Sequence, residues 1–216
     1  YNDRNIHYGS RFVFGPDGHL FFSLGDKGVL ADPQDLSKPT GKIHRIKDDG
    51  STPADNPFRQ RPGALPTIWS YGHRNPFGLA HKPGTGKVYS SENGPSCDDE
   101  LNYIRRGRNY GWGSNYQCGT AGVGNDPKGP IVRWGNIIVP TDPTWYKGKL
   151  RALNGLIMGD YGTGRVHRFV LNDTNSRVRH DRIVYDGSEG ILDVSKGPGG
   201  WLYLMTPSAI LRIVPD

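Results

Sequence analysis

Two apolar segments flank a turn in the stretch RFVF-GPDG-HLFF, residues 11–22. Proline presets φ at a turn and glycine accepts positive φ, so Gly15-Pro16-Asp17-Gly18 favours a tight connection. The phenylalanines, valine and leucine on either side favour strands. The stretch therefore predicts a β-hairpin.

This hairpin unit returns along the chain. The later copies are Gly78–His81 with Pro83–Gly86 and Val88-Tyr89, and Leu192–Val194 with Gly197–Gly200 and Trp201–Tyr203. A strand that alternates apolar and polar residues around an arginine closes each group: Ile43–Ile46, Leu101–Arg105, Val166–Phe169 and Ile210–Ile213. The turn glycines Gly18, Gly86 and Gly200 are 68 and 114 residues apart. The longer gap leaves room for a degenerate copy around Leu156–Met158 and Gly164–Val166.

Four sheet units of about 40 to 60 residues each predict an all-β chain built as β-propeller blades. A β-sandwich also uses evenly spaced short strands, but it does not require one unit to recur with the same arginine. The segment Gly113–Pro143 is rich in Gly, Asn, Pro and Thr, and we expect it to be a loop insertion on one face. Loops on one rim of a propeller are where a ligand site is expected.

Composition excludes several classes of protein. The 216 residues include 31 Gly and 17 Pro, too many for a helical bundle. No apolar run approaches the ~18 residues of a membrane span. The net charge is +6, but basic and acidic residues are interspersed, which argues against a nucleic-acid partner. The length fits residues 1–216 as a single domain.

The chain has two cysteines, Cys97 and Cys118, 21 residues apart. Their spacing is not that of a CxxC motif, and two thiols alone do not make a zinc site. The spacing favours a disulfide over two buried free thiols. A disulfide would indicate an oxidising compartment, periplasmic or extracellular.

Three segments carry residues suited to chemistry. Arg74 and Asn75 offer a guanidinium fork and an amide to a planar oxygen ligand, although Asn-Pro is also a turn signal. The segment Ser91–Glu100 is rich in acids, amides and turn carbonyls, which suits either Ca²⁺ or an ordinary polar turn. His7 could act as a general base or be a solvated terminal residue, and Asp26 ends a predicted strand.

Taken in order, these segments resemble the soluble glucose/sorbosone dehydrogenases, the quinoproteins that oxidise aldose sugars. The motifs that carry the resemblance are His7 with Gly9-Ser10-Arg11, Gly25–Gly28, Gln34–Leu36, Gly41–Ile43, Asp49–Ser51, Pro53–Phe58, Gly72–Pro76, Glu92–Pro95, Asp99–Asn102 and Asn109–Trp112. The resemblance is close over residues 5–112 and loose beyond them.

The resemblance implies a six-bladed propeller that binds pyrroloquinoline quinone (PQQ) and Ca²⁺ and oxidises an aldose C1 hydroxyl to the lactone, with an external electron acceptor. His7 resembles the base that removes the hydroxyl proton, and Asp26 the carboxylate that supports it. Arg74 and Asn75 resemble the pair that contacts the quinone oxygens. The main-chain carbonyls of Gly94 and Pro95 resemble the Ca²⁺ ligands.

The sequence departs from the family pattern at three cations that face the carboxylates of PQQ. Thr163, Gly190 and Leu192 stand at those places. Each lost charge-assisted hydrogen bond is worth about 1.5–3 kcal/mol, so we expect weaker binding of a tricarboxylate. There are two alternatives to this function. The protein could be a propeller that binds sugar or protein without redox chemistry, or it could be a calcium-dependent lactonase. About four blades and a start near His7 predict a propeller domain that lacks an N-terminal portion.

Overall fold

Nearly all of the regular structure in the computed structural model is β-strand, and the residues described are 6–9 and 11–215. The first sheet contains β1 (Phe12–Phe14), β2 (Leu20–Leu24), β3 (Lys42–Ile46) and β4 (Ile68–Tyr71); the second contains β5 (Pro76–His81), β6 (Val88–Glu92), β7 (Asp99–Ile104) and β8 (Val132–Trp134). The third contains β9 (Pro140–Tyr146), β10 (Gly155–Asp160), β11 (Arg165–Leu171) and β12 (Val178–Asp186); the fourth contains β13 (Asp193–Lys196), β14 (Leu202–Met205) and β15 (Ile210–Ile213). The short 3-10 helices are η1 (Asp32–Gln34), η2 (Arg151–Leu153) and η3 (Pro198–Gly200).

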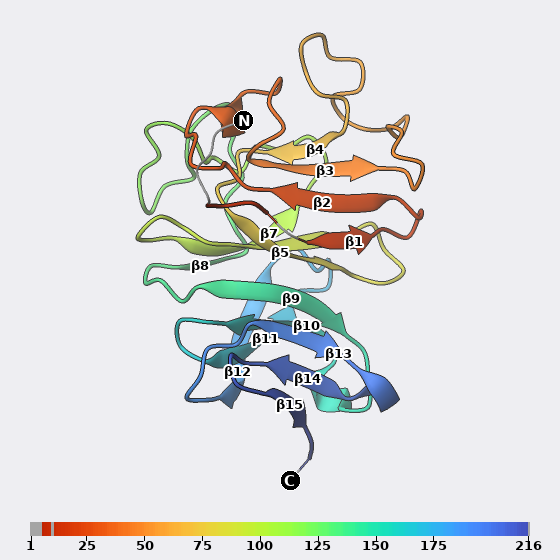
Figure 1. Ribbon diagram of the computed structural model, residues 1–216, viewed down its shortest axis with the longest axis vertical. Helices are drawn as coiled ribbons and strands as arrows, with labels where there is room; N and C mark the ends of the chain where they lie inside the picture. Colours follow the sequence, from red (N-terminus) through yellow and green to blue (C-terminus); the bar gives the residue numbers. More distant parts are fainter. Residues whose placement is uncertain (1–5, 10, 216) are drawn as a thin grey trace.

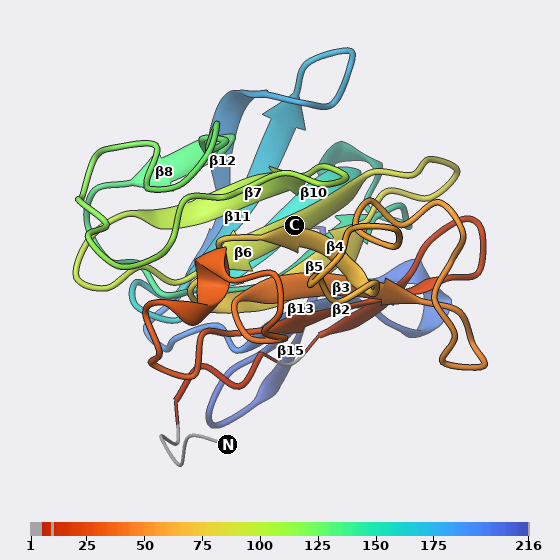
Figure 2. The same cartoon turned by 90° about the horizontal axis from the view of Figure 1, so that it is seen from above.

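Each sheet is an antiparallel meander in which strands that are consecutive in the chain pair with one another. The first sheet lies at one end of the long axis of the molecule, the third and fourth sheets lie together at the other end, and the second sheet lies between them (Figure 1). The sheets overlap when viewed down that axis (Figure 2). The first strands of successive sheets contact each other: β1 touches β5, β5 touches β9, and β9 touches β13. This arrangement confirms propeller blades and not a sandwich, because the sheets adjoin one another in chain order through their first strands.

Apolar side chains between neighbouring blades form the core. The three clusters are Phe21, Ile43, Leu79, Val88, Ile104 and Tyr110; Ala80, Tyr89, Leu101, Ile138, Leu156, Met158 and Phe169; and Tyr146, Ile157, Val166, Ile191, Val194, Leu202 and Leu204. Their members come from adjacent sheets, so each blade is stabilised by the face of the next one.

The recurring hairpins are confirmed as the first two strands of three blades. Gly18 has φ of 75° in the turn between β1 and β2, as the sequence requires. The predicted copy around residues 156–166 is only partly right. Its strands pair as β10 and β11, but these are the second and third strands of their blade, because β9 is the first.

The expectation of a loop from Gly113 to Pro143 is wrong at its C-terminal end. Residues 132–134 form β8, the outer strand of the second blade, and Pro140 begins β9. The prolines Pro140 and Pro143 made β9 unpredictable from the sequence, because proline is rare inside strands. They are tolerated because β9 lies at the end of its sheet, where one of its edges pairs with no strand among residues 6–9 and 11–215.

The two ends of the strands define two rims. One end carries Asp26 after β2, Arg74 after β4 and Gly94 after β6, and we call this end the site rim. The opposite end, the turn rim, carries the connections at residues 15–18, 82–87, 172–177 and 197–201.

A charged cluster joins the first strands of all four blades. Arg11, just before β1, pairs with Asp142 of β9 (3.3 Å) and Asp193 of β13 (3.4 Å). Asp142 also accepts a hydrogen bond from the Leu79 amide of β5, at 3.1 Å. Burial raises the pKa of Asp142 to about 7; Arg11 opposes the rise and Asp193 adds to it.

Replacement of Asp142 by Asn tests this cluster. The usual pKa of an aspartate is 3.8, so the folded protein binds the Asp142 proton more tightly than the unfolded chain between about pH 4 and 7. This contribution to the free energy of unfolding is lost as the pH rises, by at most about 1.4 kcal/mol per pH unit. Denaturant titrations between about pH 4 and 7 should show that the free energy of unfolding falls less steeply with rising pH in Asp142→Asn than in wild type. Asp173→Asn, at an exposed residue, should keep the wild-type slope; equal slopes in all three proteins would contradict this assignment.

Candidate functional site

His7 and Asp26 form a close pair on the site rim. The Nδ1 atom of His7 lies 2.6 Å from Oδ1 of Asp26, and Asp26 is almost fully buried. The backbone of His7 reaches this position by crossing Gly25, where an added Cβ would lie 2.2 Å from the His7 carbonyl oxygen. Glycine at position 25 therefore allows the segment before β1 to bring a histidine onto the end of β2.

Two further donors fix the carboxylate of Asp26. The Gly28 amide donates to Oδ1 and the indole N–H of Trp112 donates to Oδ2, both at 2.7 Å. Burial acts to raise the pKa of Asp26, but the hydrogen bonds from His7, Gly28 and Trp112 outweigh it and hold the pKa below the usual value. Asp26 is therefore an anion that orients the His7 ring.

Arg74 lies beside this pair. Its carbonyl oxygen accepts the Asp26 amide at 2.8 Å, and its guanidinium donates to the Asn93 carbonyl at 2.8 Å. The guanidinium carbon lies 5.4 Å from the Trp112 ring centroid, within cation–π range. Burial lowers the pKa of Arg74, and the charges of Asp26, Glu92 and Asp99 partly offset that effect.

A buried relay supports the main chain at Arg74. Ser70 Oγ lies 2.9 Å from His73 Nε2, and His73 Nδ1 lies 3.0 Å from Glu92 Oε2. The other oxygen of Glu92 accepts the Arg74 amide. Serine, histidine and acid in this order resemble a nucleophilic triad, but Ser70 and His73 are fully buried. The relay therefore positions Arg74 and does not meet a substrate.

The next strand end supplies oxygen atoms. The Asn93 amide donates to the Asn75 carbonyl at 3.2 Å, and the Gly94 amide donates to Asp99 at 2.8 Å. A Cβ on Gly94 would lie 1.9 Å from the Cys97 carbonyl oxygen, so only glycine fits this tight turn. The side-chain oxygen of Asn93 is buried without a hydrogen-bond partner. An unpaired oxygen beside the Gly94-Pro95 main chain fits a hard cation such as Ca²⁺.

Two cavities adjoin this strand end. One, of about 20 Å³, lies among Arg74, Asn93, Gly94, Pro95 and Trp112. The other, of about 400 Å³, is lined by Asn75, Phe77, Asn93, Gly94, Asp99, Ile137, Val139, Pro140, Thr141, Tyr161 and Leu192. Mostly apolar walls that also carry the amides of Asn75 and Asn93 and the carboxylate of Asp99 fit an aromatic ring with polar groups at its edge.

The three departures from the family pattern have distinct structural outcomes. Thr163 donates its hydroxyl to the buried carboxylate of Asp160. A Cβ on Gly190 would lie 2.4 Å from the Tyr161 carbonyl oxygen, so a long side chain does not fit there without movement. Leu192 lines the 400 Å³ cavity, whose described lining contains no lysine or arginine.

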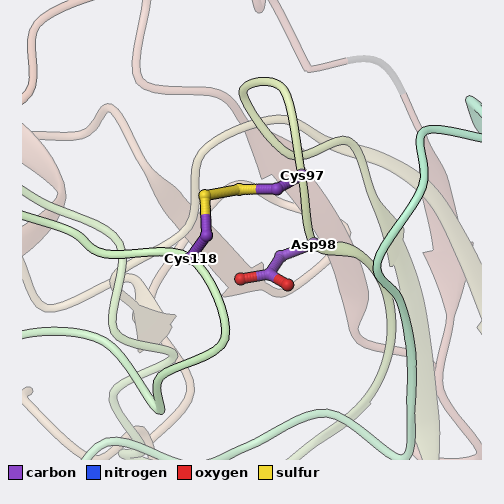
Figure 3. Close-up of side chains that lie close together, drawn as sticks. All are labelled: Cys97, Asp98 and Cys118. Carbon is purple, nitrogen blue, oxygen red and sulfur yellow. A yellow bond between two sulfur atoms is a disulfide. The ribbon is translucent and has the colours of Figure 1, made fainter.

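The predicted disulfide is present between Cys97 and Cys118, with their Cα atoms 6.1 Å apart (Figure 3). Asp98 lies beside it and accepts hydrogen bonds from the Tyr116 hydroxyl (2.7 Å) and the Gly119 amide. Cys97, Asp98 and Cys118 do not form a metal site, because sulfur atoms in a disulfide cannot act as thiolate ligands. The bond ties the turn after Gly94 to the loop that follows Trp112.

The structure brings all of the sequence-predicted site residues to one rim: His7, Asp26, Arg74, Asn75, Gly94 and Pro95. Sequence reasoning missed the roles of Trp112 and Glu92. Both lie in motifs that carried the family resemblance, but only the fold shows that Trp112 reaches Asp26 and that Glu92 holds the Arg74 amide.

Comparison with known proteins identifies the family. The model of the glucose/sorbosone dehydrogenase family matches residues 1–213. The aldose sugar dehydrogenase YliI of Escherichia coli (strain K12) is 34% identical over 230 residues, which cover 97% of this chain and 60% of the relative. The chain therefore belongs to the glucose/sorbosone dehydrogenase family.

Two solved structures share the fold. The apo form of the soluble aldose sugar dehydrogenase from Escherichia coli superposes with a TM-score of 0.81 at 31% identity, over 93% of this chain and 61% of that one. The PQQ-bound aldose sugar dehydrogenase from Streptomyces coelicolor gives 0.77 at 30% identity, over 93% and 56%. The chain thus spans about three fifths of these relatives. In the described residues, no helix has the length and apolar character needed to cross a membrane.

Removal of the disulfide should destabilise the protein without changing its fold. A bond that closes a loop of 21 residues is worth about 3 kcal/mol in the chain-entropy account. We expect the Cys97→Ser/Cys118→Ser variant to lose about that much free energy of unfolding in denaturant titrations. Dithiothreitol should lower the stability of wild type equally and leave the double variant unaffected. Two titratable thiols in unreduced, unfolded wild type would contradict the assignment.

Proposed function

We propose that the protein oxidises the C1 hydroxyl of an aldose sugar to the lactone, with PQQ and Ca²⁺ as cofactors. One observation carries the proposal: the His7–Asp26 pair and the Arg74 guanidinium meet at Trp112. Arg74 and Trp112 line the cavity of about 20 Å³, which shares Asn93 and Gly94 with the 400 Å³ cavity. The family membership and the quinone-bound relative support it.

In this proposal His7 is the general base. Asp26 engages Nδ1, so the anion favours the tautomer with the proton on Nδ1 and leaves Nε2 to accept a proton from the sugar hydroxyl. Asp26 then stabilises the imidazolium that forms. Because three donors fix the carboxylate, the ring does not need to reorient during the transfer.

Arg74 and Asn75 would hold the quinone oxygens, and the main-chain oxygens of Gly94 and Pro95 would hold Ca²⁺. When bound, PQQ supplies the two-electron acceptor for the hydride of the sugar C1. Arg74 stabilises negative charge that develops at its ligand, and the Glu92 relay fixes the main chain that carries it. The mostly apolar walls of the larger cavity would pack against the ring of the bound quinone.

An external electron acceptor would then reoxidise the cofactor. The Cys97–Cys118 bond supports a periplasmic or secreted location, because disulfides persist in oxidising compartments.

A propeller that binds sugar without redox chemistry is the second candidate. It is favoured by the lining of the larger cavity, which includes Leu192 and, among the described residues, no lysine or arginine that could pair with a carboxylate. The two candidates differ in whether the protein turns over an aldose, and in the first candidate that turnover depends on His7.

Replacement of His7 by Ala distinguishes them. Loss of a general base lowers kcat by about 10²–10⁴-fold, which dye-linked oxidation of aldoses measures in full-length protein reconstituted with PQQ and Ca²⁺. The matched control is His180→Ala, at an exposed position of β12 outside the site, which should retain wild-type turnover. Equal turnover in both variants, or none in wild type despite bound PQQ, would contradict the proposal.

A cation placed in the larger cavity should strengthen cofactor binding. Leu192→Arg adds a charge where the carboxylates of PQQ are expected, and such a hydrogen bond contributes about 1.5–3 kcal/mol, or tenfold or more in Kd. Absorbance titration with PQQ measures the affinity. Ile183→Arg, at an exposed position outside the cavity, is the control; equal tightening in both variants would indicate nonspecific attraction.

A further inference from the structure

A basic cleft lies between the second and third blades, at the turn-rim ends of β7 and β12. It has a volume of about 340 Å³ and is lined by Tyr103, Arg105, Lys128, Gly129, Pro130, Ile131, Ser176, Arg177 and Val178. Its three cations come from three separate segments: after β7, before β8 and before β12. This volume lies within the range of small-molecule sites.

The walls of the cleft are held by hydrogen bonds between the two blades. The Tyr89 hydroxyl donates to the Asn175 carbonyl at 2.7 Å, and Lys87 donates to the Thr174 carbonyl. Within the β11–β12 connection, Asn172 Oδ1 accepts the Ser176 amide at 2.8 Å and the Arg177 amide at 3.1 Å. The segment that carries Arg177 is therefore ordered before any ligand binds, which lowers the entropic cost of binding.

The positive charge of the cleft is only partly neutralised. Lys128 pairs with Asp126 at 2.8 Å. Arg105 and Arg177 have no carboxylate partner in the residues that the structure describes. The guanidinium carbon of Arg105 lies 5.1 Å from the centroid of the Tyr103 ring, and Nζ of Lys87 lies 5.7 Å from the same centroid. Cations that converge in one cleft repel each other, so an anion bound among them would be stabilised.

We propose that this cleft binds a phosphate or sulfate group. Guanidinium groups bind tetrahedral oxyanions through paired hydrogen bonds, and two arginines and a lysine from three segments of the chain line this cleft. The group comes either as the free ion or as an ester on a sugar polymer. The cleft is on the rim opposite to His7 and Asp26, so this site is independent of the proposed oxidation.

Titration of the full-length protein with inorganic phosphate, inorganic sulfate and a heparin fragment tests the proposal, by calorimetry at fixed ionic strength. At least one of the three should bind wild type, and Arg105→Gln/Arg177→Gln should raise its Kd about tenfold or more. Binding of the free ions would identify the ion as the source; binding of heparin alone would identify an esterified polymer.

Arg182→Gln is the matched control, because Arg182 is exposed on β12 away from the cleft. It should change Kd less than twofold. An equal loss in the control would overturn the site in favour of nonspecific charge attraction, and so would unchanged binding in the double variant. No binding of any of the three anions to wild type would overturn it as well. Circular dichroism of both variants shows that the fold is intact.

Discussion

The buried carboxylate of Asp26 is the interaction on which the site depends. Its two oxygens accept hydrogen bonds from the histidine before β1, the amide of Gly28 and the indole of Trp112. An unpaired anion at this depth would be costly, and each donor offsets part of that cost while its own position becomes fixed. One carboxylate therefore aligns three segments that are distant in the sequence.

The blade arrangement makes this convergence possible. Because each blade is an antiparallel meander whose first strand lies beside that of the next, the ends of β2, β4 and β6 reach the same rim. Asp26, Arg74 and Gly94 follow these three strands. The Arg11–Asp142–Asp193 cluster joins the first strands, and the Cys97–Cys118 bond ties the Gly94 turn to the loop after Trp112. The site rim is therefore held by the ion pairs that join the first strands and by the disulfide that joins two of its loops.

The sequence predicted much of this because the hairpin turns depend on local chemistry. Gly15-Pro16-Asp17-Gly18 strongly favours a tight turn, so the recurrence of similar turns revealed the blades. The proposed site residues lie in the ordered motifs that carry the family resemblance, so the sequence indicated that they act together, and the fold places them on one rim. The strand β9 was not, since Pro140 and Pro143 are tolerated only at an open strand edge, which the fold creates. The roles of Trp112 and Glu92 depend on contacts between blades, and the basic cleft depends on the approach of Arg177 to Arg105.

A crystal structure of the full-length protein with PQQ, Ca²⁺ and an aldose would test the central claim most directly. We expect the quinone in the 400 Å³ cavity, its oxygens within hydrogen-bond distance of Arg74 and Asn75, and Ca²⁺ on the carbonyls of Gly94 and Pro95. The sugar C1 hydroxyl should lie within hydrogen-bond distance of Nε2 of His7. Ordered PQQ elsewhere on the protein, or a sugar hydroxyl beyond the reach of His7, would contradict the account.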